Sequence, residues 1–178
     1  VAFRERLYEP MKLLFDSNTP IHSVLGNHCH KDGHALNQIN DERLGMDGNQ
    51  YYRLIGDQGL YSFYMLDSDV IEFDQGQREW LVDTLRKDES RWLVCVLHVP
   101  PYASEIGHGD SKPLQRILET ACYKAGKNFD LIINGHNHVF ERRFVERLGA
   151  LSITQGASGK DSTYDHWNED PLRLAYYD

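Results

Sequence analysis

The residue types best suited to metal chemistry lie at the ends of short apolar runs. His136 and His138, one residue apart, follow the run 130–134, which is too short for a helix and predicts a buried strand. A histidine pair at a strand end can aim two neutral ring nitrogens into one pocket, and imidazole binds zinc, iron, copper and nickel. Taken alone, such a pair is more often an accident of the surface than a metal site.

The same arrangement occurs at two other places in the chain. The apolar run 21–25 is followed, after one glycine, by Asn27 and His28. The apolar run 92–97 ends at His98, after which two prolines stop the strand. Ligands of open α/β sheets bind beyond the carboxyl ends of the strands. If the three runs are strands of one sheet, these polar side chains meet at one edge, which packing does not explain.

The remaining pattern favours an α/β fold. Helices are predicted at 1–16, 75–87 and 111–125, hairpins at 51–66 and 140–154, and a long polar loop at 29–50. The helix after Ser111 is the clearest, because Ser111 suits an N-cap and Gly126 a helix end. The strand, helix and strand between 92 and 134 predict a parallel pair.

Length and charge exclude several classes of protein. The 178 residues, of which 40% are hydrophobic and 26% charged, predict one globular domain, and no apolar run is long enough to span a membrane. The net charge of −8 argues against a nucleic-acid or anionic-membrane binder, because these partners need a basic face. An acidic protein that acts on an anionic substrate needs bound cations to reverse the local field.

Cys29, Cys95 and Cys122 predict neither a disulfide framework nor a zinc knuckle, because their number is odd and no CxxC pair is present. We expect Cys95 and Cys122 to be small buried hydrophobes. The chain does not begin with methionine, so we expect it to start partway through a longer protein.

Three further polar residues lie close to the predicted site. Asp67 ends an apolar strand, where an aspartate more often caps a turn than binds a metal. His30 and His34 fall in the predicted loop, where histidines are usually solvated, and we leave them out of the site.

Together these segments resemble the signature motifs of the calcineurin-like metallophosphoesterases. Gly-Asn-His at 26–28 and Gly-His-Asn-His at 135–138 stand in the family's order, with a histidine motif between them. The purple acid phosphatase branch is the most similar. The stretch 98–102 resembles its His-x-Pro-x-Tyr, His108 follows ten residues after the first histidine, and 140–142 (Phe-Glu-Arg) continues the last motif as in that branch.

The resemblance implies a dinuclear metal centre. Asn27, His98 and His136 are similar to the family's ligands of one ion, and His138 is similar to a ligand of the second. The implied cofactors are two divalent or trivalent ions, of Fe, Zn or Mn. A neutral amide and imidazoles add no negative charge, so the ions stay electrophilic.

The resemblance also implies the reaction. His28 and His108 are similar to the family's histidines that face the phosphate, where they stabilise the transition state or protonate the leaving oxygen. The reaction is hydrolysis of a phosphate ester by in-line attack of a metal-bound hydroxide, without a covalent intermediate.

The implied fold is the αββα sandwich of metallophosphoesterases, with mixed β-sheets flanked by helices. Residues 1–178 are expected to form its carboxyl-terminal portion as a single domain, because the family's first motifs, Asp-x-His and Gly-Asp, are absent before Asn27. We therefore expect this chain to hold one ion or none and to turn over little substrate, whereas its parent is a phosphoesterase. Exposed sheet edges favour an oligomer, and the resemblance favours an exported protein.

Other classes of function remain open at this point. A structural metal site would need only the histidines, but such sites favour cysteine. A catalytically inactive binding domain could keep the fold and lose the first motifs. A nucleic-acid enzyme is disfavoured by the acidic charge.

Overall fold

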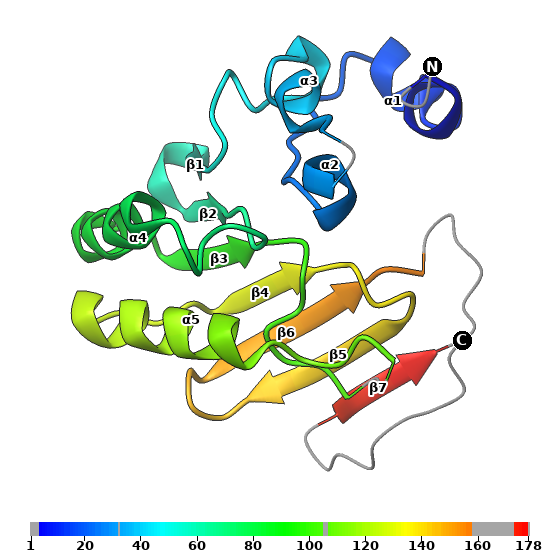
Figure 1. Ribbon diagram of the computed structural model, residues 1–178. Coiled ribbons are helices and arrows are strands. Elements are labelled where there is room, and N and C mark those ends of the chain that lie inside the picture. Colours follow the sequence, from blue (N-terminus) through cyan, green and yellow to red (C-terminus); the bar gives the residue numbers. More distant parts are fainter. Residues whose placement is uncertain (1–3, 32, 105–106, 158–172, 178) are drawn as a thin grey trace.

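The computed structural model describes residues 4–31, 33–104, 107–157 and 173–177. Its elements are η1 (Arg4–Tyr8), α1 (Lys12–Asp16), α2 (Asn27–Lys31), α3 (Ala35–Ile39), η2 (Glu42–Leu44), β1 (Tyr52–Gly56), η3 (Asp57–Gly59), β2 (Tyr61–Met65), α4 (Gln75–Lys87), β3 (Trp92–Val96), α5 (Lys112–Ala125), β4 (Leu131–Asn134), β5 (Phe140–Val145), β6 (Ala150–Gln155) and β7 (Arg173–Tyr177). In Figure 1, α4 and α5 lie on one side of the sheet, and α1 to α3 lie beyond the ends of β3 and β4.

The strands of the described residues form one mixed sheet, in the order β1-β2-β3-β4-β6-β5-β7. β2, β3, β4 and β6 run parallel, whereas β1 and β5 run antiparallel to their neighbours. The predicted α/β class, with a mixed sheet flanked by helices, is confirmed. Both predicted hairpins and the parallel pair of β3 and β4 are also confirmed. β7, which pairs with β5, was not foreseen from the sequence.

The two long helices are capped as their sequences require. The Asp74 carboxylate accepts a hydrogen bond from the Gln77 amide at 3.0 Å, and Ser111 Oγ accepts one from the Leu114 amide at 3.4 Å. α5 ends at Gly126, which adopts the left-handed conformation that a helix terminus favours. The apolar faces of both helices pack on one face of the sheet, where Cys95 and Cys122 are buried as predicted.

The prediction of a strand at 21–25 is wrong. Its residues form no ladder in the described part of the chain, and Ser23 instead donates its amide to Leu44 O at 3.1 Å. Leu25 is fully buried in a small second cluster with Ile39 and Met46. The apolar run therefore reflects packing beneath α3, because a strand also needs a neighbouring backbone to satisfy its polar groups.

The amino-terminal segment is more helical over 29–50 than predicted, and its first helix is divided around Pro10, a break that proline favours. The expected helix at 1–16 consists, where it is described, of η1 and α1, which are separated around Pro10. The expected loop at 29–50 contains α3 and η2. Among the described helices, none combines the length and apolar character needed to cross a bilayer.

Candidate metal centre

Two adjacent parallel strands deliver the central residues of the site. His98 follows β3 and Gly135 follows β4, and the Gly135 amide donates a hydrogen bond to His98 O at 3.0 Å. Both segments therefore leave the sheet at the same edge, as the sequence pattern predicts. Asn27 comes from the other direction, because it begins α2 in the amino-terminal segment.

Three donor atoms converge at this edge. His98 Nε2 lies 3.0 Å from Asn27 Oδ1 and 3.1 Å from His136 Nδ1. A single proton on His98 Nε2 can be donated with good geometry to only one of these two neighbours. Two ligands about 2.1 Å from one cation lie roughly 3.0–3.4 Å apart. The donor set and spacing therefore fit a transition-metal ion.

Backbone geometry makes room for this contact. A Cβ at Gly26 would lie 3.0 to 3.1 Å from three atoms of the His98 ring, so a side chain there would press on the imidazole. His136 adopts a φ of 62°, in the left-handed region that costs a non-glycine residue about 1 kcal/mol. The turn after β4 is thus held in a conformation that brings the His136 ring toward that of His98.

Both central imidazoles are neutral near pH 7. Burial, and secondly the charge of His28, lowers the pKa of His98 to about 4. Burial, and secondly the charge of His98, lowers the pKa of His136 to about 4. A metal ion binds the neutral form, so these two rings need lose no proton to bind one above about pH 5.

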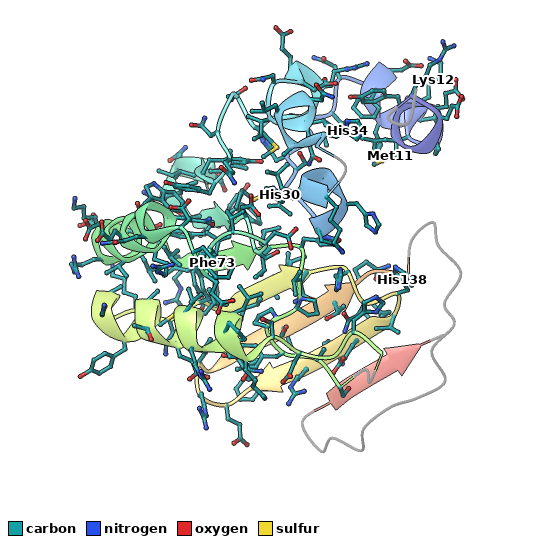
Figure 2. All side chains as sticks on the ribbon, viewed as in Figure 1. Met11, Lys12, His30, His34, Phe73 and His138 are labelled. Carbon is teal, nitrogen blue, oxygen red and sulfur yellow. The ribbon has the colours of Figure 1, made fainter. Side chains whose placement is uncertain are left out.

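The other predicted histidines surround this group. The His108 ring lies 4.6 Å from the His136 ring and 5.5 Å from the His138 ring, measured between centroids. The charges of His28 and His138 both lower the pKa of His98. All the residues assigned from the motifs therefore gather at one end of the sheet, where Figure 2 shows His138 beyond the strands.

The sequence reasoning missed the role of His30. His30 Nε2 lies 2.8 Å from Asp67 Oδ2, and the same buried oxygen accepts a hydrogen bond from Gln50 Nε2 at 2.7 Å. Asp67 Oδ1 also caps the expected turn by accepting the Asp69 amide at 3.1 Å. His30 is thus tied to the end of β2 and is not a solvated loop residue, whereas His34 is exposed (Figure 2). Only its pairing with a distant aspartate, which no local pattern reveals, could have identified it.

Carboxylates contribute little to the central group. In the part of the chain that the structure describes, no three His, Cys, Asp or Glu side chains form a cluster able to hold a metal ion. The amide of Asn27 is the third member beside His98 and His136.

Comparison with known proteins identifies the family of the chain. The sequence profile described as calcineurin-like phosphoesterase matches residues 2–140. The chain belongs to this family. Two Arabidopsis thaliana proteins, probable purple acid phosphatase 20 and purple acid phosphatase 21, are 33% and 32% identical to it over 111 residues. The predicted likeness to purple acid phosphatases is therefore confirmed.

The match covers only part of these relatives. It includes 57% of this chain but 24% and 23% of the two plant proteins, so the chain spans about a quarter of their length. The properties of a complete plant enzyme do not transfer to it directly.

Solved structures match the fold. GAP50, described as the anchor in the inner membrane complex of Plasmodium, aligns with 88% of this chain and 56% of its own, with a TM-score of 0.65 and 18% identity. PhoD aligns with 79% of this chain and 38% of its own, with a TM-score of 0.53 and 11% identity. At these identities the likeness concerns the fold alone.

Proposed function

We propose that this chain is the carboxyl-terminal, metal-binding portion of a phosphoesterase that hydrolyses a phosphate ester. The observation that supports this most directly is the convergence of Asn27 Oδ1, His98 Nε2 and His136 Nδ1, at 3.0 and 3.1 Å, in a chain of the calcineurin-like family. In this proposal the three residues hold one ion, and His138 contributes to a second.

Bound cations would lower the pKa of a water molecule and neutralise charge on the phosphate. The chain's own residues supply the rest. Asn27, His98 and His136 fix the position of the reacting centre with neutral ligands. His28 and His108 face the phosphate, where His108 donates a proton to the leaving oxygen and His28 stabilises negative charge on the phosphoryl group. Proton donation requires His108 to be held near the rings of His136 and His138.

A second candidate is a catalytically inactive binding domain of the same family. It is favoured by the absence, among the described residues, of a three-member cluster of His, Cys, Asp and Glu. An ion held by one amide and two imidazoles, without a carboxylate, is bound weakly. GAP50, whose structure is described as an anchor, shares the fold.

Metal titration of the 178-residue chain tests the proposal. We expect Zn²⁺ or Mn²⁺ to bind weakly, with about one ion per chain by calorimetry and elemental analysis, and His98→Ala to abolish this binding. His34→Ala is the matched control, because that histidine is exposed and outside the group. Equal binding by the wild type and His98→Ala would contradict the proposed ligands.

Hydrolysis of an aryl phosphate separates the two candidates. We expect little turnover from residues 1–178 and metal-dependent turnover from a chain extended with the residues encoded upstream of Val1. The inactive-domain alternative predicts no turnover from either chain. Robust turnover by residues 1–178 alone would show that these residues contain a complete catalytic centre.

A further inference from the structure

His108 lies in a surface loop, whereas Asn27 and His28 belong to α2 and the other proposed active-site histidines follow β3 or β4. It is exposed, yet its ring lies 4.6 Å from that of His136 and 5.5 Å from that of His138. Buried contacts that hold the loop help to keep an exposed side chain in such a position.

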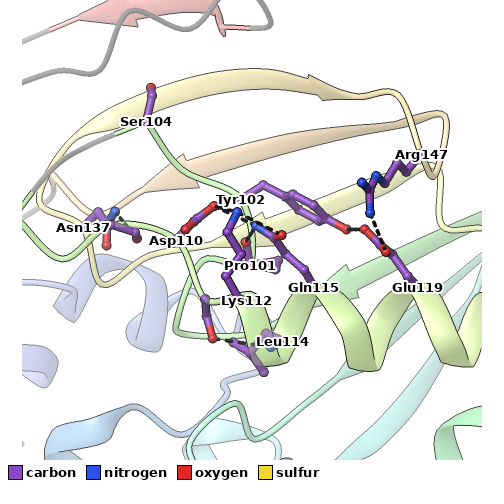
Figure 3. Close-up of polar contacts among 12 residues, drawn as sticks. Pro101, Tyr102, Ser104, Asp110, Lys112, Leu114, Gln115, Glu119, Asn137 and Arg147 are labelled. Atoms are coloured by element: carbon purple, nitrogen blue, oxygen red, sulfur yellow. Dashed lines mark hydrogen bonds and ion pairs between the residues drawn. The ribbon is translucent and has the colours of Figure 1, made fainter.

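The base of this loop is fixed at the start of α5. Gln115 Nε2 donates to Pro101 O and to Asp110 Oδ2, both at 2.7 Å, so one amide joins the two ends of the loop. Figure 3 shows these contacts beside Lys112, which forms an ion pair with Asp110 at 2.8 Å. This anchor sets where the loop begins and ends but leaves the position of His108 undetermined.

Two buried residues of the 135–141 segment contact the loop at positions nearer to His108 in the sequence. Glu141, which is 1% exposed, accepts hydrogen bonds from the Ser104 amide at 3.0 Å and from Ser104 Oγ at 2.7 Å. Asn137, which is fully buried, donates from Nδ2 to Gly109 O at 3.1 Å. Asn137 is therefore hydrogen-bonded to the residue that follows His108. Figure 3 shows Asn137 beside the loop.

Asn137 is itself held by its own backbone. Its amide donates to Gly135 O at 2.7 Å, and its carbonyl accepts from the Val139 amide at 2.8 Å. A Cβ at Gly156 would lie 1.8 Å from the Asn137 carbonyl oxygen, so the end of β6 packs directly against this turn. The side chain that reaches Gly109 is thus part of the same rigid turn that carries His136 and His138.

The side-chain amide of Asn137 contributes little net stability to the fold, because one of its two polar atoms is unsatisfied. Among the residues that the structure describes, its Oδ1 has no hydrogen-bond partner although it is buried. A buried unsatisfied acceptor costs about 1–3 kcal/mol, which offsets the hydrogen bond that Nδ2 makes. Removing the side chain should therefore change the stability of the fold little while it releases Gly109.

We propose that Asn137 is a positioning residue for His108. Through its hydrogen bond to Gly109, Asn137 sets the distance between the loop and its two sequence neighbours, His136 and His138. The catalytic part of this inference rests on the proposed function. The structural part, that Asn137 holds the position of His108, does not. Glu141 supports the same loop from its other side.

The structural test uses the metal-free 178-residue chain. We expect a proton NOE between the rings of His108 and His136 in the wild type, and its loss in Asn137→Ala with an unfolding midpoint close to that of the wild type. Asn134→Ala is the matched control, because Asn134 is also buried but its side chain bonds to Ser152 and Thr154 of β6 and, among the described residues, not to the loop. Persistence of the NOE in Asn137→Ala, or its equal loss in Asn134→Ala, would overturn the proposal.

The kinetic test uses whichever of the two chains described under the proposed function, residues 1–178 or the extended chain, hydrolyses phosphate esters. For an alkyl phosphate, whose leaving group needs a proton, we expect Asn137→Ala to lower kcat about a hundredfold with KM little changed. An aryl phosphate with a good leaving group should lose much less. In a His108→Ala background, Asn137→Ala should have no further effect, whereas a merely structural role would still lower the rate.

The two tests distinguish the failure of each idea. If no form of the protein hydrolyses phosphate esters while the NOE is lost in Asn137→Ala, the proposed function fails and the positioning contact stands. If hydrolysis is observed and the losses from Asn137→Ala and His108→Ala are additive, Asn137 does not act through His108 and the inference is wrong.

Discussion

At the scale of single residues, two glycines set the space around the His98 ring. A Cβ at Gly26 would meet three ring atoms at 3.0 to 3.1 Å, a separation that obliges the imidazole to move. A Cβ at Gly135 would lie 4.0 Å from His98 Nδ1, which is ordinary van der Waals contact. Neither glycine has a positive φ, so the comparison isolates the effect of space.

We therefore predict that Gly26→Ala weakens metal binding by about tenfold or more, because His98 Nε2 is displaced from Asn27 and His136. Gly135→Ala should bind metal almost as well as the wild type. Calorimetric titration with Zn²⁺ measures both affinities. Equal affinities for the two variants would show that the His98 ring adapts to the added methyl group.

At the scale of elements, Asp88 joins the end of α4 to the β1–β2 hairpin. Its buried carboxylate accepts a hydrogen bond from Tyr64 Oη at 2.6 Å and one from the Ser90 amide at 2.8 Å, and it pairs with Arg53 at 2.8 Å. Burial alone would raise the pKa of Asp88, but the hydrogen bonds from Tyr64 and Ser90 outweigh it and lower that pKa to about 2. One ionised carboxylate thus ties the end of α4 to β1 and β2, in addition to the apolar packing of the helix.

We predict that Asp88→Ala lowers the free energy of unfolding by about 3–5 kcal/mol, because it leaves Arg53 without its buried partner. Asp83→Ala should change it by less than about 0.5 kcal/mol, since that aspartate pairs with Arg86 on the exposed face of the same helix. Urea unfolding of the three proteins measures the difference.

The same carboxylate gives a pH dependence of known sign. Its pKa is lower in the folded chain than in the unfolded chain, where it is near 4, so the unfolded state binds more protons. The stabilisation is complete above about pH 4 and is lost as the pH falls toward 2. Asp88→Asn should remove this part of the acid dependence, and an unchanged slope between pH 4 and 2 would assign it to other groups.

At the scale of the whole molecule, the proposed ion joins two parts of the chain. Asn27 belongs to the amino-terminal segment, which has its own small core, whereas His98 and His136 leave the main sheet. A ligand that binds only the folded state stabilises it by about 2.7 kcal/mol at 100 times its Kd. We predict that Zn²⁺ at that concentration raises Tm by about 5–10 °C in a chain of this size.

His98→Ala should abolish the rise in Tm, and His34→Ala should retain it. Differential scanning calorimetry with and without EDTA gives the comparison. A similar rise in all three proteins would indicate binding to surface histidines instead.

Much of the fold was determined by the sequence itself, because its signals are local. The cap at Ser111, the glycine at 126, the prolines after His98 and the hairpin at 51–66 each specify backbone geometry within a few residues. The resemblance of the Gly-Asn-His and Gly-His-Asn-His segments to the family motifs suggested the proposed ligands, and the strand ends placed His98 and His136 at one edge.

Only the tertiary structure decided the rest, because those features join distant parts of the chain. The run 21–25 has the composition of a strand, but a strand requires a ladder of backbone hydrogen bonds. Among the described residues the run forms no ladder, although the Ser23 amide donates to Leu44 O. Two further contacts join residues that are far apart in the sequence. His30 pairs with Asp67 across 37 residues, and Asn137 bonds to Gly109 across 28 residues, so no local sequence pattern predicts either contact. The sequence therefore indicated the family and the candidate residues, and long-range packing determined which other side chains hold those residues in place.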